Sequence, residues 1–310
     1  MMRTDVTFDS AGLKLAGHLY TPEDGKQGPR PAVVVGHPAS GVKEQAAGLY
    51  AERLARAGFV TLAFDAAHQG GSEGTPRGLE DPAQRVEDIK AAVSFLSVRA
   101  EADPDRIGAL GICASGGYVV PAAAGDHRIK AVGTVSAADI GRQFREGADG
   151  TQDPAVVQAM LDAAAAARTA EARGAGAGEF PVFPDTEEEA RALGRHAFEG
   201  WEYYRTNRAR HPRSADSFTW NSVDRIVTFD PFRFAGLIAP RPLLMIVGTE
   251  AVTSHMTTEA FANAREPKSL HWIEGASHVD LYDKDAYVTP AVAELTAFFR
   301  SGLGEPARVG

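Results

Sequence analysis

The sequence predicts an α/β fold, a doubly wound and mainly parallel sheet with an N-terminal hairpin and a mostly helical insertion. Short, continuously apolar runs alternate with helix-length segments, a pattern typical of strands buried on both faces of a parallel sheet. The alternation stops between about residues 141 and 235 and then resumes. Right-handed crossovers between such strands place the connecting helices on both faces of the sheet.

The elements before the insertion follow from local signals. Residues 6–8 and 13–20 are expected to form the hairpin, with Asp9-Ser10-Ala11-Gly12 as its turn. Asp81 followed by Pro82 predicts a helix start, because Asp caps helices and proline is tolerated at the first helical position. The expected strands are 31–36, 59–64, 106–112 and 129–135, and the expected helices are about 44–57, 81–99 and 114–124.

The insertion changes the pattern. An Ala-rich helix is expected from Asp153-Pro154 to Gly174, then a flexible Gly-rich link over 174–178, then a charged helix over about 186–204. A long solvated linker is the alternative, but many aromatic side chains here need burial. These aromatic residues are Trp201, Tyr203, Tyr204, Phe218, Trp220, Phe229, Phe232 and Phe234.

We therefore expect two parts, an α/β core of residues 1–140 and 236–310 and a helical cap or lid over 141–235. After the insertion the alternation resumes with strands at 242–248 and 270–273 and helices at about 257–265 and 289–299. Ligands of such sheets bind beyond the carboxyl ends of the strands, so functional residues are expected in loops that follow strands.

Composition excludes several classes of protein. The formal net charge of −9 and the pI of about 5.5 argue against nucleic acid or an anionic membrane as a partner. No apolar run approaches the roughly 20 residues that span a bilayer, and no apolar signal core is visible, so a cytoplasmic protein is expected. A single cysteine excludes an intrachain disulfide, and no residues show metal-ligand spacing. We expect a small-molecule substrate and no cofactor or metal, and the sequence leaves a homodimer open.

The cysteine lies in a turn that suits a nucleophile. An elbow needs a strand, a very tight turn and a helix, with small residues on either side of the nucleophile. The expected strand runs directly into Cys113, and Gly111 and Ser115 flank it at the small-residue positions. A second frame, 113–117, would make Ser115 the nucleophile but would place it inside the helix. Cys113 is favoured, while Ser115 as nucleophile and a purely structural turn remain alternatives.

A cysteine nucleophile needs activation, because a free thiol titrates near ~8.5. A helix N-terminus favours the thiolate, and a neighbouring imidazole is the usual base. His278 follows the last expected strand, where a base would reach the elbow. Glu250 is the carboxylate that follows strand 242–248 and is the first candidate for the acid. Asp139 is the second candidate, and a Cys–His dyad without an acid is the third.

The oxyanion of an acyl-transfer reaction needs two backbone N–H donors. Ala114 would supply one, and Ala39 the other, because Pro38 has no N–H. His37 could order this loop or be purely structural. The insertion is expected to supply the wall of the substrate pocket, where His37, Trp201, Tyr203, Tyr204 and Trp220 are candidates. Aromatic residues at this spacing also fit a hydrophobic core.

Taken together, these residues resemble the dienelactone-hydrolase-like branch of the α/β-hydrolases, which carries a cysteine in a Gly-x-Cys-x-Gly-Gly elbow. A bacterial group within this branch is more similar still. The similar segments cover most of the chain and are 37–45, 64–70, 203–206, 211–213, 266–270 and 275–283. Two positions depart from the pattern, because Ser115 stands where members often carry Gly and Val252 where Asp is expected. The resemblance implies an α/β-hydrolase fold with a Cys–His site, but it does not supply the acid.

Three functions are compatible with these residues. The first is hydrolysis of an ester, lactone or thioester through an acyl group on Cys113. The second is non-hydrolytic chemistry on the same scaffold, such as C–C bond cleavage, cyclisation or isomerisation, with His278 moving a proton. The third is a binding protein that retains a relic site.

Overall fold

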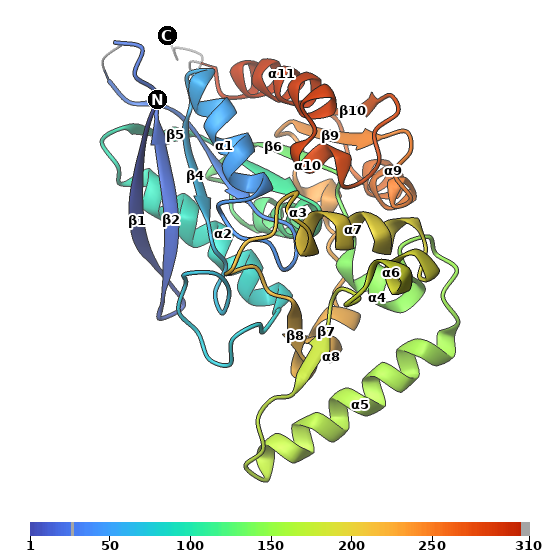
Figure 1. Cartoon of the computed structure of the whole chain (residues 1–310). Helices are drawn as coiled ribbons and strands as arrows, with labels where there is room; N and C mark the ends of the chain where they lie inside the picture. Colours follow the sequence, from blue (N-terminus) through green and yellow to red (C-terminus); the bar gives the residue numbers. More distant parts are fainter. Residues whose placement is uncertain (26–27, 305–310) are drawn as a thin grey trace.

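The computed structural model describes residues 1–25 and 28–304, and its central feature is an eight-stranded sheet (Figure 1). The strand order is β1-β2-β4-β3-β5-β6-β9-β10. Strand β2 pairs antiparallel with β1 and β4, and the remaining pairs are parallel. The bounds are Met2–Ser10, Leu13–Thr21, Arg30–Gly36, Val60–Phe64, Ala102–Ile112, Ile129–Val135, Leu243–Gly248 and Lys268–Ile273 for β1, β2, β3, β4, β5, β6, β9 and β10. The predicted doubly wound, mainly parallel sheet is confirmed.

The continuous apolar run of β3 is explained by its neighbours on both faces. Val33 and Val35 belong to a buried cluster with Tyr50 and Phe299, from helices α1 (Ala46–Arg56) and α11 (Asp285–Gly302). Val34, between them, points into the opposite cluster with residues of α2 (Pro82–Ser97) and α3 (Ala114–Gly125). Successive side chains of a strand face opposite sides, so a strand covered on both faces needs an unbroken apolar sequence.

The remaining helices of this core lie near the carboxyl ends of the last two strands. They are α9 (Ser254–Asn263) after β9 and α10 (Asp280–Asp283) after β10. The helices α9 and α11 begin three and four residues earlier than the sequence predicted, at Ser254 and Asp285. Within residues 1–25 and 28–304, no helix is both long enough and apolar enough to cross a bilayer.

The segment between β6 and β9 forms a group of elements, mostly short, beyond the carboxyl ends of the strands (Figure 1). The bounds are Ile140–Glu146 (α4), Pro154–Ala172 (α5), Glu179–Pro181 (β7), Glu187–Ala192 (α6), Arg195–Arg205 (α7), Ser217–Thr219 (β8), Trp220–Ser222 (η1), Val223–Val227 (α8) and Ala235–Leu237 (η2). The antiparallel pair β7–β8 was not predicted. Helix α5 projects from the rest of the chain, and its buried residues are Val157 and Ala164.

Candidate active site

Cys113 lies in the turn between β5 and α3 and has a backbone conformation that few residues adopt. Its φ is 56° and its ψ is −120°, outside the regions that L-residues normally occupy. Gly111 makes this turn possible, because a Cβ atom there would lie 2.1 Å from the carbonyl oxygen of Ser115. A strained residue held by a tight strand–turn–helix connection is the geometry of a nucleophile elbow.

Ser115, the alternative nucleophile, is fully engaged inside the fold. Its hydroxyl donates to the carbonyl oxygen of His37 at 2.6 Å and accepts from Nη2 of Arg85 at 3.1 Å. The residue is 2% exposed and lies in the first turn of α3. These contacts give Ser115 a structural task, which leaves Cys113 as the residue at the apex of the turn.

The thiol of Cys113 faces two backbone donors and one hydroxyl. It interacts with the backbone N–H groups of Ala39 and Ala114 and with the phenol of Tyr282. Burial raises the pKa of the thiol, although these three contacts and the charge of Arg85 act in the opposite direction. The resting cysteine is therefore a neutral thiol at pH 7. The structure brings together Cys113, Ala39 and Ala114 as the sequence predicted.

His278 lies beside the elbow and is completely buried. Its Nε2 is 3.0 Å from the hydroxyl of Tyr282, and its Nδ1 is 2.5 Å from Oγ1 of Thr253. Burial, followed by the neighbouring His196, holds the pKa of His278 well below its usual value of 6.5. The imidazole is therefore neutral, and Tyr282 lies between it and the thiol.

The carboxylates expected to orient His278 do not contact it. Glu250 points outward with a side chain 54% exposed and pairs with Arg195 at 3.2 Å. Its backbone N–H is tied to the carbonyl oxygen of Ala276, which fixes this orientation. Asp139 caps α4 by accepting from the backbone N–H of Arg142 at 2.7 Å. The expectation of Glu250 or Asp139 at His278 is therefore corrected, because Thr253 occupies that place.

His37 is buried behind the loop that carries Ala39 and is not in the expected pocket wall. Its Nε2 accepts from the backbone N–H of Ala66 at 3.1 Å and from Nη1 of Arg85 at 2.9 Å, so the proton is on Nδ1, which donates to the carbonyl of Pro38 at 2.7 Å. Burial, followed by the charge of Arg85, holds the pKa of His37 well below 6.5. A neutral His37 therefore fixes the loop that carries the N–H of Ala39.

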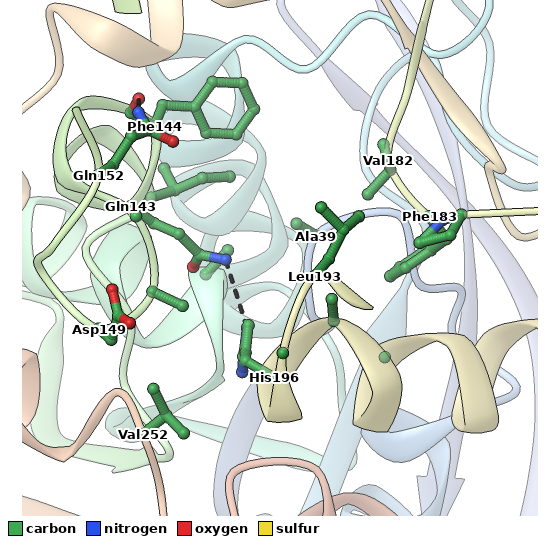
Figure 2. Close-up of a pocket in the computed structure, with 18 of the residues that line it drawn as sticks. Ala39, Gln143, Phe144, Asp149, Gln152, Val182, Phe183, Leu193, His196 and Val252 are labelled. Atoms are coloured by element: carbon green, nitrogen blue, oxygen red, sulfur yellow. Dashed lines mark hydrogen bonds between the residues drawn. The ribbon is translucent and has the colours of Figure 1, made fainter. Parts of the chain in front are cut away.

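A cavity of about 930 Å³ opens at the thiol, and Figure 2 shows part of its wall. The floor includes Cys113, Ala39 and Ala114, and the walls come mainly from the segment between β6 and β9. Of the residues expected in the wall, Tyr204 lines the cavity. The others lie elsewhere in the described structure. Trp201 stacks on Phe198, Tyr203 and Trp220 pack edge-to-face against Tyr282 and Phe180, and His37 is buried beneath the loop.

Three residues of the site were missed by the sequence reasoning. Tyr282 is four residues after His278, a spacing that places two side chains on one side of a helical turn, so it could have been found. Thr253 directly follows Val252, the position where the acid is expected, and it carries no charge that would mark it as a partner of His278. His196 lies on α7 with its ring centroid 4.9 Å from that of His278, and no local signal marks it.

Comparisons with known proteins agree with this architecture. The model of the dienelactone hydrolase family matches residues 15–137. The uncharacterized protein YcjY of Escherichia coli K12 is 38% identical over 311 residues, which are 98% of this chain and 100% of that protein. The crystal structure of the hypothetical protein PA2218 from Pseudomonas aeruginosa is 34% identical, with a TM-score of 0.89 over 97% of this chain and 94% of that one.

A more distant relative carries a functional name. The thiohydrolase apmlB of Arthrinium phaeospermum is 28% identical over 287 residues, which cover 89% of each chain. The full-length similarity to YcjY and the match to the family model lead to one assignment. The chain belongs to the dienelactone-hydrolase-like branch of the α/β-hydrolases and is an enzyme of the hydrolase type.

Proposed function

We propose that the protein hydrolyses an ester, lactone or thioester bond of a small organic substrate, with Cys113 as nucleophile and His278 as base. One observation carries the proposal. The strained elbow presents the thiol to the N–H groups of Ala39 and Ala114, next to the Tyr282–His278 pair and at the floor of the cavity. Nucleophile, oxyanion donors and base are the three parts that acyl transfer requires.

The first half of the reaction acylates the cysteine. The sulfur attacks the substrate carbonyl as the thiol proton passes to the Tyr282 oxygen and the phenol proton passes to Nε2 of His278. The N–H groups of Ala39 and Ala114 stabilise the oxyanion that forms. The tetrahedral intermediate then breaks its bond to the leaving alcohol or thiol, which takes the proton from His278. The product of this half is an S-acyl group on Cys113.

The second half returns the enzyme to its starting state. A water molecule attacks the acyl carbonyl while His278 takes one of its protons. The bond from carbon to sulfur breaks, the carboxylic acid leaves, and the proton on His278 restores the thiol of Cys113. His278 therefore acts as base and then as acid in each half of the cycle.

The segment over 141–235 is proposed to act as a cap that supplies the acyl-binding wall. Phe144, Val182, Phe183 and Leu193 from this segment line the cavity (Figure 2). An apolar wall accommodates the carbon chain of an acyl group and excludes water from the carbonyl. The name of the relative apmlB, a thiohydrolase, favours a thioester among the three possible bonds.

A second candidate is non-hydrolytic chemistry on the same scaffold, such as C–C bond cleavage, cyclisation or isomerisation. Thr253 favours it, because a hydroxyl in place of a carboxylate at Nδ1 stabilises an imidazolium less than Asp would. A neutral imidazole of low pKa at His278 favours a brief proton transfer over a stable imidazolium–thiolate pair with Cys113.

Acid quenching during turnover and mass spectrometry of the intact protein test the proposal. With a decanoyl thioester of N-acetylcysteamine, we expect the mass of a decanoyl group on a peptide that contains Cys113. The adduct and turnover should be lost in Cys113→Ala and strongly reduced in His278→Ala, while Ser115→Ala keeps the adduct on Cys113. Unchanged turnover in Cys113→Ala would contradict the proposal. Turnover by the wild type of other carbonyl substrates without any adduct would favour the non-hydrolytic candidate.

A further inference from the structure

His196 has a ring nitrogen that no residue of the described structure uses. The residue lies at the start of α7 and lines the cavity, with its ring nearly perpendicular to that of His278 at a centroid distance of 4.9 Å. Its Nε2 is 3.3 Å from Nε2 of Gln143 (Figure 2). Its Nδ1 is buried and has no hydrogen-bond partner among residues 1–25 and 28–304. A buried polar atom without a partner is costly, which suggests that a ligand supplies one.

The protonation state of His196 determines which ligand groups can form a hydrogen bond with its Nδ1. Burial lowers the pKa of His196 to about 4, so the imidazole is neutral at pH 7. The Gln143 amide nitrogen donates to Nε2 of His196, which leaves the proton on Nδ1. Nδ1 is then a neutral donor that requires an oxygen acceptor. A neutral imidazole cannot offset the burial of a carboxylate, so the expected acceptor is an uncharged oxygen.

Nδ1 of His196 is a polar atom in a cavity whose wall is mostly apolar. The cavity wall is largely apolar and includes Phe144, Val182 and Leu193. Gln152 also lines the cavity, but its amide already donates to the carbonyl of Phe144 at 2.9 Å. The ring of His196 lies 4.9 Å from the ring of His278, and therefore at the end of the cavity that holds Cys113 and Tyr282.

We propose that His196, oriented by Gln143, is a specificity-determining residue that binds a neutral oxygen, hydroxyl or keto, carried by an otherwise apolar acyl chain near its scissile carbonyl. The inference rests on the proposed function, since it takes the scissile carbonyl to lie at Cys113. The substrate class is then an oxygenated medium-length acyl ester or thioester. A cavity of about 930 Å³ is large enough for such a chain.

Matched thioesters of N-acetylcysteamine test the inference by kinetics. The wild type should hydrolyse the β-hydroxydecanoyl and β-ketodecanoyl thioesters with a kcat/KM about tenfold above that of the decanoyl thioester, the value of one hydrogen bond. The kcat/KM of an ω-hydroxydecanoyl thioester should equal that of the decanoyl thioester. In His196→Phe the kcat/KM values of the β-oxygenated and the decanoyl thioesters should become equal, whatever the change in their common level. Val182→Ala, a change in the apolar wall, should lower hydrolysis of all four by a similar factor and keep the preference.

Unreactive ligands separate this inference from the proposed function. β-Hydroxydecanamide should bind to the wild type about tenfold more tightly than decanamide, and His196→Phe should remove the difference. Binding of the amides is measured by calorimetry and needs no turnover. A preference among the amides without any hydrolysis would refute the proposed function alone. Hydrolysis without a preference in either assay would refute the role of His196 alone.

A second variant, Gln143→Leu, tests the inference independently in case His196→Phe fails to fold. Gln143→Leu removes the amide that orients the imidazole and should reduce the hydroxyl preference while the imidazole remains. Circular dichroism and thermal unfolding establish that each variant is folded. An unchanged preference in both folded variants would overturn the inference.

Discussion

Oγ1 of Thr253 lies 2.5 Å from Nδ1 of His278, at the place where a carboxylate orients the histidine of an acyl-transfer triad. Both residues are buried, with exposed fractions of 1% and 0%. A hydroxyl can fix the tautomer of the imidazole, with the proton on Nδ1 and the lone pair on Nε2, but it adds no negative charge. Thiol and imidazole therefore rest as neutral groups, and proton transfer has to accompany attack on the substrate.

Thr253→Asp should convert the neutral thiol of Cys113 and the neutral imidazole of His278 into a thiolate–imidazolium ion pair. A carboxylate at this distance stabilises the imidazolium, which in turn should lower the apparent pKa of Cys113 by about 2 pH units. The rate of alkylation by iodoacetamide, measured from pH 5 to 10, reports this pKa. Thr253→Asn adds a polar group of the same size without charge and should leave the profile unchanged. An equal shift of the alkylation profile in Thr253→Asp and Thr253→Asn would show that the charge is not the cause.

Glu250→Gln should have little effect on catalysis, in contrast to Thr253→Val. Glu250 is exposed and pairs with Arg195, whereas Thr253 is the partner of His278. We expect kcat/KM within about twofold of the wild type for Glu250→Gln. Thr253→Val should lower kcat/KM by about tenfold or more, because Nδ1 loses its buried partner. A large loss in Glu250→Gln would restore Glu250 as a functional residue.

The sheet and the elbow could be predicted because their signals are local. The continuous apolar run of β3 indicates a strand that is covered on both faces. The tight turn at Cys113 requires a residue without a Cβ atom at position 111, and the sequence has Gly there. Parallel strands then bring their carboxyl ends to one edge, so the convergence of Cys113, Ala39 and His278 follows from topology.

The partners of His278 could not be predicted, because they depend on how each loop folds back. The turn after β9 directs Glu250 outward and Thr253 inward, through a hydrogen bond from the Glu250 N–H to the carbonyl of Ala276. His196 reaches the site from the inserted segment, whose packing has no periodic signal. The aromatic residues there do need burial, as expected, but Trp220 satisfies that need against Phe180 and not in the cavity.

Tyr282→Phe should slow acylation of Cys113 without loss of the fold. The phenol lies 3.0 Å from Nε2 of His278 and also contacts the thiol, so its removal breaks the path of the proton. We expect kcat/KM to fall about 100-fold, in the range for loss of acid–base catalysis. Rapid-quench measurement of the S-acyl adduct locates the effect in the first half of the reaction.

Tyr203→Phe is the matched control for Tyr282→Phe. Its ring packs against that of Tyr282 at a centroid distance of 5.2 Å, but its hydroxyl accepts from the backbone N–H of Ala46. The variant should lose about 1 kcal/mol of stability and keep its rate of acylation. An equal loss of activity in both variants would indicate that packing, not proton transfer, is the role of Tyr282.

Gly111→Ala should abolish the elbow. Its Cβ atom would lie 2.1 Å from the carbonyl oxygen of Ser115, which is backbone and cannot move without displacing α3. We expect a loss of about 3 kcal/mol or more in the free energy of unfolding and no measurable acylation. Gly176→Ala is the control, because no atom lies within 4 Å of the added methyl group. Chemical denaturation of the two variants measures the difference.

Acidification should destabilise the protein in part through His196. Its pKa is lowered to about 4 in the folded state, against about 6.5 in the unfolded chain, so the unfolded state binds more protons between these values. The free energy of unfolding therefore rises with pH through this window, and the penalty is absent above about pH 7. His37 and His278 contribute in the same direction, because burial also lowers their pKa values. Replacing His196 by Phe should reduce the loss of stability between pH 7 and 5.5 by about 1.2 kcal/mol. Urea unfolding of the wild type and of His196→Phe at the two pH values measures this difference, and equal losses would contradict a neutral, buried His196.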